Sequence, residues 1–133
     1  MKKILIAFLL LFSLSSLFAL SDKEEIENAL TVYQNAFNTR DKEKFKSVVM
    51  NPENVDSAFS LLELPYMTQY NFQVEITVLN IEIEGAKASV ETYLKFTMDL
   101  GDMEYMRELL PISEGSLITY TFIKYHDKWL LVN

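Results

Sequence analysis

Few side chains in this sequence have the type and spacing that catalysis requires, and Tyr33 is the first of them. It lies on an apolar stripe with helical periodicity that predicts a helix over residues 21–39. A buried phenol can donate a hydrogen bond to negative charge that develops in a transition state. A tyrosine packed in a core, with its hydroxyl bonded to a backbone group, is the commoner role. We therefore assign no catalytic residue from the sequence.

The other titratable candidates indicate solvated surfaces rather than a metal site. His126 is the only histidine and precedes Asp127 in a predicted turn, so a histidine-based metal site would lack a second imidazole. Several glutamates lie on one face of the predicted strands, but no loop has the ligand spacing of a calcium-binding loop. These glutamates are Glu75, Glu82, Glu84 and Glu91. We expect an exposed sheet face there, and we predict no metal and no cofactor.

A further acidic cluster lies within residues 99–115, where the pattern predicts neither a helix nor a strand. Methionine and tyrosine, which suit adaptable contact surfaces, lie among its acidic residues: Asp99, Asp102, Glu104 and Glu108. A plain loop is the preferred interpretation. A lip over the mouth of a pocket and an exposed edge used for dimerisation are the alternatives.

Composition restricts the class of protein. With 133 residues, the chain is too short for two full domains. It has no cysteine, which excludes a disulfide framework and a thiolate metal site. Its formal net charge of −7 argues against nucleic acid as a partner, because a nucleic-acid-binding protein needs a basic patch.

The N-terminus is typical of a secretory signal peptide. Two lysines precede an apolar run from Ile4 to Leu14, and Ala19 offers a small residue at the cut. We expect residues 1–20 to be a signal peptide and residues 21–133 to form a single exported domain, periplasmic or extracellular. The alternative is an uncleaved segment that anchors the chain in a membrane, because this stretch approaches the lower length limit of a span.

Three helices are predicted at the start of the mature chain. In the first, residues 21–39, apolar side chains recur every three or four positions. Asp41 is a suitable cap for a second, shorter helix that carries Phe45. The third is predicted from Val55 to Leu64, and Pro65 is expected to end it.

The rest of the chain is predicted to form antiparallel strands. Apolar residues alternate from Phe72 to Ile83, and the alternation shifts by one position at Val78-Leu79, which predicts a β-bulge. A turn at Glu84-Gly85 leads into a strand over residues 86–98. A last hairpin turns at His126-Asp127, and large residues on both of its faces favour a central place in the sheet.

Helices followed by an antiparallel meander constitute an α+β arrangement. The run from Val32 to Asp41, with Phe45 after it, and the closing hairpin with Trp129 resemble the nuclear transport factor 2-like superfamily, which includes ketosteroid isomerase and scytalone dehydratase. The resemblance implies a cone-like, cystatin-like fold in which N-terminal helices pack on a curved, mostly antiparallel sheet. It also implies a pocket at the open end of the cone. In ketosteroid isomerase, a tyrosine that Tyr33 matches binds the developing oxyanion, but that enzyme's second oxyanion donor has no counterpart here.

Six residues are our candidates for the lining of this pocket: Tyr33, Phe37, Phe96, Tyr120, Phe122 and Trp129. We expect a non-enzymatic domain that binds a small apolar or amphipathic ligand or a protein partner. One alternative is a lyase or isomerase for a small hydrophobic carbonyl compound, in which Tyr33 would meet Asp56 or Asp99. The other is a structural or interaction module that forms a homodimer through the outer face of its sheet.

Overall fold

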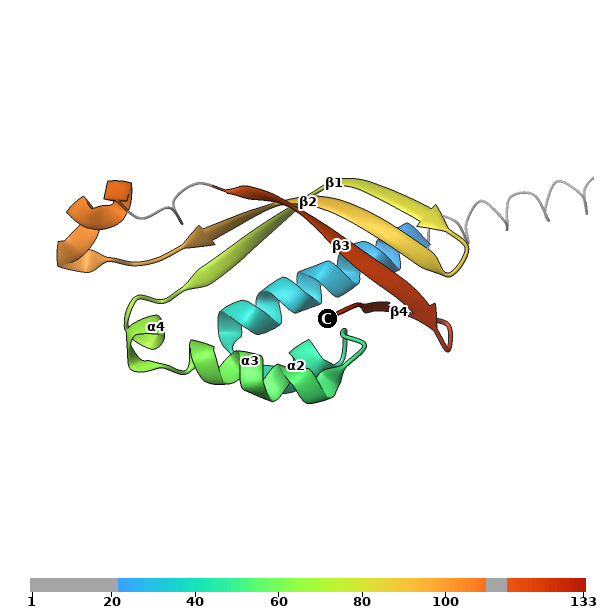
Figure 1. Ribbon diagram of the computed structural model, residues 1–133, viewed down its shortest axis with the longest axis horizontal. Coiled ribbons are helices and arrows are strands. Elements are labelled where there is room, and N and C mark those ends of the chain that lie inside the picture. The colour runs from blue at the N-terminus through green and yellow to red at the C-terminus, as the bar shows by residue number, and fades with distance from the viewer. Residues whose placement is uncertain (1–21, 110–114) are drawn as a thin grey trace, which may run out of the picture.

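The computed structural model describes residues 22–109 and 115–133 (Figure 1). The expected signal peptide, residues 1–20, lies outside the described residues. A four-stranded antiparallel sheet curls as a half-barrel over a long N-terminal helix, and shorter helices lie below that helix (Figure 1). Among the described residues, no helix is both long and apolar enough to cross a bilayer.

The N-terminal helix, described over residues 22–39, crosses beneath the sheet. Its apolar stripe is buried, with Ile26 at 0% and Leu30 at 2% exposure, as the helical periodicity predicts. Helix α2 (Lys42–Lys46) follows after a break. The side chain of Asp41 caps it by accepting a hydrogen bond from the amide of Lys44 at 3.2 Å. This confirms the predicted cap.

A short 3₁₀ turn, η1 (Pro52–Asn54), leads into α3 (Val55–Leu62). The inward side of α3 is confirmed, since Val55 and Phe59 are each 1% exposed. α3 ends before Pro65, as predicted, although at Leu62 rather than Leu64, and Pro65 begins a further helix, α4 (Pro65–Gln69), which the sequence did not predict. A proline fits the first turn of a helix, where its missing N–H would have no partner within the helix.

The sheet has the strand order β1-β2-β3-β4, with every pair antiparallel. The strands are β1 (Gln73–Glu84), β2 (Lys87–Thr97), β3 (Ser116–Tyr125) and β4 (Lys128–Leu131). The register between β1 and β2 shifts between Val78 and Asn80, which confirms the predicted bulge. The predicted turn between β3 and β4 is also confirmed, and His126 and Asp127 have positive φ values of 48° and 60° there, as a tight hairpin turn requires.

The predicted central position of the last hairpin was half wrong. β3 lies inside the sheet, but β4 ends it. The free edge of β4 is covered by the segment that follows α2, because the amide of Leu131 donates to the carbonyl of Val48 at 2.8 Å and the amide of Met50 donates to the carbonyl of Leu131 at 2.8 Å. This coverage explains why a strand at the end of the sheet carries large residues on both faces.

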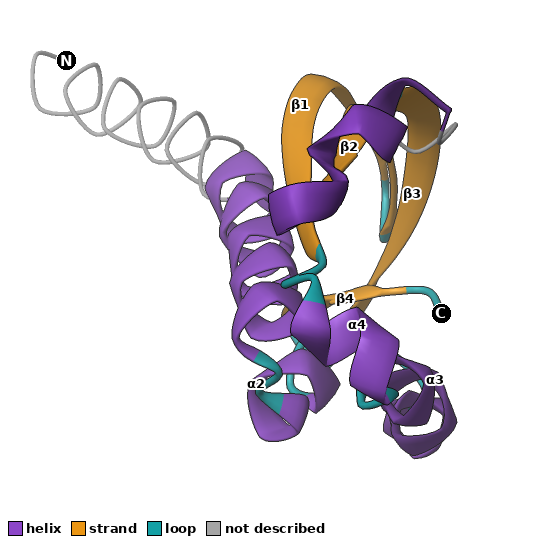
Figure 2. Cartoon of the chain, turned by 90° about the vertical axis from the view of Figure 1, so that its left-hand side faces the viewer, coloured by secondary structure: helices purple, strands orange, loops and turns teal. Residues whose placement is uncertain are grey.

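Residues 101–109 form η2 (Gly101–Leu109), a 3₁₀ segment with a kink at Met103. It lies at the end of the molecule where β2 ends and β1 begins (Figure 2). Its start is anchored by Leu100, which is 7% exposed. The preferred interpretation of residues 99–115 as a plain loop was therefore wrong for residues 101–109, which are helical, and residues 110–114 lie outside the described residues.

Candidate functional site

The concave face of the sheet is closed at one end and half-open at the other. At the closed end, Ala88, Phe122 and Leu131 share one row across three strands and are 0–3% exposed. Further along β2, the side chains of Leu94 and Phe96 alternate onto the same face but are only half-buried. The concave face therefore presents apolar side chains to water at the open end.

Thr92 marks the boundary between the two ends. It is 0% exposed, and its hydroxyl donates to the carbonyl of Ile118 at 2.8 Å. A buried hydroxyl must find such a partner, because an unpaired polar group costs free energy in an apolar core.

Three phenylalanines from different elements form a cluster at the open end. The rings of Phe72 and Phe96 are stacked with centroids 4.9 Å apart, and Phe37 packs on Phe72 at 6.3 Å. Phe37 comes from the N-terminal helix, Phe72 precedes β1 and Phe96 lies near the end of β2. The cluster therefore joins the helix to the half-open part of the sheet.

Tyr33 and Tyr120 form a polar pair between the open end and the core. Their rings meet edge to face at 5.9 Å, and Tyr33 also packs on Phe45 at 4.5 Å. Burial raises the pKa of Tyr33, and a hydrogen bond with Tyr120 partly opposes that rise. The pKa of Tyr120 is also raised, first by burial and then by the nearby Tyr33. Both phenols therefore stay protonated at neutral pH.

The six candidates separate into two groups. Four are half-buried at or near the open end, namely Tyr33, Phe37, Phe96 and Tyr120. Phe122 and Trp129 are 0% and 2% exposed and belong to the closed core. Of these four, Phe37 and Phe96 belong to the phenylalanine cluster at the open end, whereas Tyr33 and Tyr120 pack against the core, with Tyr120 opposite the fully buried Val90.

Trp129 takes part in a different arrangement, which ties the start of the N-terminal helix to the last hairpin. The indole N–H of Trp129 and the ammonium group of Lys124 each donate to Oδ1 of Asp22 at 3.0 Å. The bond from Trp129, followed by the bond from Lys124, lowers the pKa of Asp22. Because both partners favour the carboxylate, Asp22 is ionised at neutral pH.

The carboxylates that an enzymatic site would need do not meet Tyr33 in the described structure. Asp56 is exposed and pairs with Lys46 at 3.2 Å. Asp99 is also exposed, and its side chain accepts from the amide of Gly101 at 3.2 Å. His126 is exposed in the turn between β3 and β4, and the described residues contain no group of three metal-ligating side chains.

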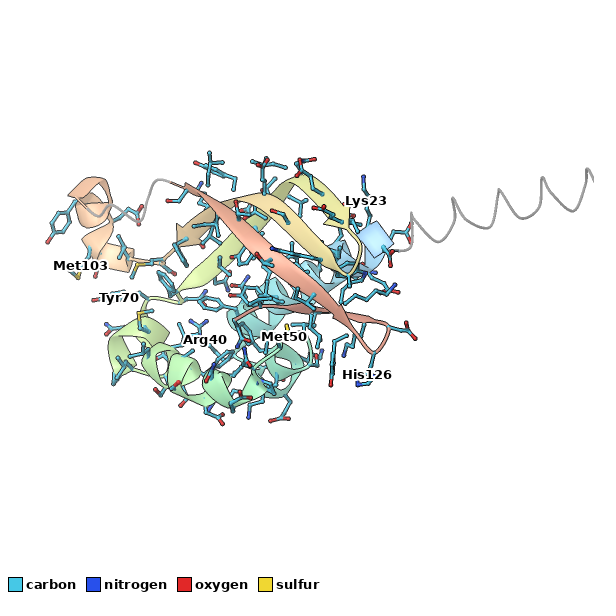
Figure 3. All side chains as sticks on the ribbon, turned by 45° about the vertical axis from the view of Figure 1, so that its right-hand side comes forward. Lys23, Arg40, Met50, Tyr70, Met103 and His126 are labelled. Carbon is cyan, nitrogen blue, oxygen red and sulfur yellow. The ribbon has the colours of Figure 1, made fainter. Side chains whose placement is uncertain are left out.

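The described residues form several surface hollows. One of 400 Å³ lies between the end of α4 and the start of η2, near Tyr70 and Met103. Figure 3 shows these two residues at the end of the molecule that is opposite to His126. A second hollow of 330 Å³ separates the N-terminal helix from the last hairpin beside Trp129, and a third of 210 Å³ lies between that helix and β1.

Sequence reasoning missed three parts of this arrangement. Phe72 was counted as a strand residue, although its alternation with Val74 already placed it on the inner face. Asp22 showed only the acidic character of a first helical turn. The hydrogen bond between Tyr33 and Tyr120 depends on the strand register, and no local pattern indicates it.

Neither a family model nor a curated protein sequence matches the chain. Solved structures do match it. A protein of unknown function with a cystatin-like fold from Nostoc punctiforme has a TM-score of 0.58 at 15% identity, covering 84% of this chain and 86% of its own. A candidate dehydratase of the nuclear transport factor 2-like family from Streptomyces avermitilis has a TM-score of 0.56 at 16% identity, with coverages of 84% and 91%.

A third structure, an LEH-like epoxide hydrolase from Mycobacterium tuberculosis, has a TM-score of 0.51 at 10% identity and covers 82% of this chain and 76% of its own. At such identities the similarity concerns the fold and not the activity, since one fold supports many functions. The fold agrees with the resemblance found in the sequence. The chain has the nuclear transport factor 2-like, cystatin-like α+β fold, with helices packed on a curled antiparallel sheet.

Proposed function

We propose that the chain is an exported, non-enzymatic domain that binds a small apolar or amphipathic ligand at the open end of its concave face. The observation that carries the proposal is the change of exposure along β2. Ala88 and Val90 are 1% and 0% exposed, whereas Leu94 and Phe96 on the same face are only half-buried. Apolar side chains that face inwards and still touch water gain free energy when an apolar molecule covers them.

The tyrosine pair gives this surface one polar group. Two phenols that share one hydrogen bond use only one of their two hydroxyl protons in it, so the pair keeps one proton for an acceptor on a ligand. A carbonyl or carboxylate oxygen on the ligand matches this donor. The raised pKa values support binding rather than proton abstraction, because a protonated phenol donates a hydrogen bond and does not act as a base.

The enzyme names among the structural neighbours are not carried over to this chain. A lyase or isomerase would need a general base beside Tyr33, and Asp56 and Asp99 are both engaged at the surface. The aromatic neighbours of Tyr33 are instead Phe45 and Tyr120. This environment suits the retention of a ligand more than its conversion.

Native mass spectrometry of the protein purified from its own host tests ligand binding directly. We expect an additional small mass that is lost when the protein is denatured. A fluorescence titration with 8-anilinonaphthalene-1-sulfonate, an apolar dye with one anionic group, then locates the site. Leu94→Gln should weaken dye binding about tenfold, or ~1.4 kcal/mol.

The matched control is Leu117→Gln, a change of the same residue type on the outer face of the same sheet, where Leu117 is 75% exposed. This control should bind the dye as the unmodified protein does. Equal weakening by both variants, or no weakening by Leu94→Gln, would contradict a site on the concave face.

Export rests on the signal-like N-terminus. It is tested by the intact mass of the protein recovered from the periplasm or medium of its host. We expect a mass that lacks residues 1–20, within a residue or two. A full-length mass that fractionates with membranes would instead support the anchored alternative.

A homodimer through the outer sheet face is a second candidate function, and the outer face of β3 favours it. The outward side chains of β3 carry no charge from one end of the strand to the other: Leu117, Thr119, Thr121, Ile123 and Tyr125. Interface cores are depleted in charged residues and enriched in tyrosine. Size-exclusion chromatography with light scattering should then show a dimer that Leu117→Arg converts to a monomer, and a monomer at high concentration would count against this candidate.

A further inference from the structure

β1 is an edge strand, and the N-terminal helix satisfies only the first half of its free edge. Oδ1 of Asn38 accepts from the amide of Val74 at 2.7 Å, and Nδ2 of Asn38 donates to the carbonyl of Val74 at 2.9 Å. One turn earlier on the helix, Oε1 of Gln34 accepts from the amide of Ile76 at 2.7 Å. The helix then leaves this edge and crosses towards the last hairpin, where Asp22 is bonded.

The second half of the edge is left free. In an antiparallel edge strand, the N–H and C=O groups of every second residue point away from the neighbouring strand. In β1 these residues include Val74 and Ile76. Because the bulge shifts the alternation by one position, the next residues with such outward groups are Val78, Ile81 and Ile83. Their side chains point to the concave face, and no hydrogen bond joins these outward groups to another described residue. An unpaired edge of this kind is a template for another strand.

A groove beside the free edge can receive a side chain from such a strand. It has a volume of 210 Å³ and lies between the N-terminal helix and β1. Its lining is formed by Glu27, Leu30, Thr31, Gln34, Ile76 and Val78. An added strand would direct every second side chain towards this inner side, and the apolar part of the lining favours an apolar residue there.

The opposite side of the free edge is acidic. Glu82 and Glu84 are exposed on the outer face, and neither forms an ion pair with a described residue. Cross-strand neighbours of opposite charge stabilise a ladder, and like charges destabilise it. A second copy of this chain is disfavoured as the added strand, because it would bring Glu82 and Glu84 of both copies together.

We propose that residues 78–84 of β1 pair with an extended segment of a partner protein in which apolar and basic residues alternate. The backbone of the segment completes the ladder, its apolar side chains follow the concave face towards the groove, and its basic side chains lie opposite Glu82 and Glu84. This is recognition by strand addition, in which main-chain bonds supply affinity and alternate side chains supply specificity. It uses a surface separate from the proposed ligand site.

The probe for the test is the peptide acetyl-KVKVKVK-amide, added to the full mature chain and followed by residue-resolved amide hydrogen exchange. In the free protein, the amides of Ile81 and Ile83 should exchange faster than those of Val74 and Ile76, which the helix already bonds. A saturating peptide should slow exchange at Ile81 and Ile83 at least tenfold and leave Val74 unchanged. Unchanged exchange at Ile81 and Ile83 would overturn the proposal.

Charge variants test the acidic side of the site. The double variant Glu82→Lys with Glu84→Lys should weaken peptide binding at least tenfold, whereas Glu75→Lys, on the same strand beside the half that the helix covers, should leave it nearly unchanged. The acidic peptide acetyl-EVEVEVE-amide should not bind the unmodified protein. Equal weakening of peptide binding by the double variant and by Glu75→Lys would overturn the proposal. Slower amide exchange at Ile83 when only the protein concentration is raised would also overturn it, because this result indicates pairing between two copies of the chain.

Discussion

The two ends of the concave face are built from the same strands but are stabilised by different interactions. At the closed end, Phe122 and Ala88 are covered by the N-terminal helix and the segment that follows α2, and are at most 1% exposed. At the open end, Leu94 and Phe96 remain half-exposed. Besides the packing of Phe37 on Phe72, the open end is attached to the helix by hydrogen bonds from side chains to the backbone, such as those of Asn38 with Val74.

This difference shows how a small domain can keep an apolar surface uncovered without losing the strand beneath it. Burial of apolar area stabilises the closed end and cannot do so where a ligand is to enter. Polar bonds at the strand edge help to hold the geometry of the open end, where the phenylalanine cluster covers only part of the inner face. Arg40 adds to them by donating to the carbonyl of Phe72 at 2.7 Å.

The largest expected effect is a loss of stability at the closed end. Phe122→Ala should lower the free energy of unfolding by about 3–5 kcal/mol, because it removes a fully buried ring and leaves a cavity. Phe96→Ala, the same change at the open end, should cost less than half as much, since its ring is already half-exposed. Urea denaturation measures both. Equal losses would mean that the two ends are equally closed.

Much of the fold follows from local patterns in the sequence. The apolar stripe predicted the N-terminal helix, Asp41 predicted the start of α2, and the shift in alternation at Val78 predicted the bulge. The sequence missed α4 because a proline that stops one helix can equally begin another. Whether it starts a new helix depends on what the next residues pack against, and that is not a local property.

The candidate site was predictable only in part. Tyr33 and Tyr120 were both identified, but their hydrogen bond depends on the placement of β3 over the helix. The bonds of Asn38 to Val74 span 36 residues and that of Trp129 to Asp22 spans 107. Such bonds have no signature in a window of sequence. Phe96 in β2 and Phe122 in β3 both occupy inward positions of an alternating strand, so the sequence could not show which end of the face was closed.

The second largest expected effect on stability concerns the hydrogen bonds that attach the open end to the N-terminal helix. Asn38→Ala should lower the free energy of unfolding by about 2 kcal/mol, because it leaves the N–H and C=O of Val74 without partners at a residue that is 5% exposed. The control is Asn35→Ala, which changes an exposed asparagine on the same helix and should be nearly neutral. Amide exchange at Val74 should accelerate in the first variant alone. A neutral Asn38→Ala would show that the open end does not depend on these bonds.

A smaller effect is expected for the polar bond at the closed end. Asp22→Ala should cost about 1–2 kcal/mol at pH 7, because the buried indole N–H of Trp129 loses its acceptor. Since the folded-state pKa of Asp22 lies below its ordinary value of 3.8, its contribution is present above about pH 4 and is lost as the pH falls through the folded-state pKa. The stability difference between variant and parent should therefore shrink in acid. Glu24→Ala, in the same turn and exposed, should show neither effect.

The smallest effect tests the outer face above the open end, where Tyr93 lies over Gly115. A Cβ added at Gly115 would come within 2.2 Å of the Tyr93 ring, which must therefore move. Because Tyr93 is 41% exposed, its ring can turn into solvent, and Gly115→Ala should cost less than about 1 kcal/mol. In a Tyr93→Ala background the same change should cost nothing, so a double-mutant cycle should give a coupling energy equal to the single-variant cost. If Gly115→Ala still lowered the free energy of unfolding in the Tyr93→Ala background, the backbone at residue 115 would itself require glycine. The outer face at this end would then be more rigid than its exposure indicates.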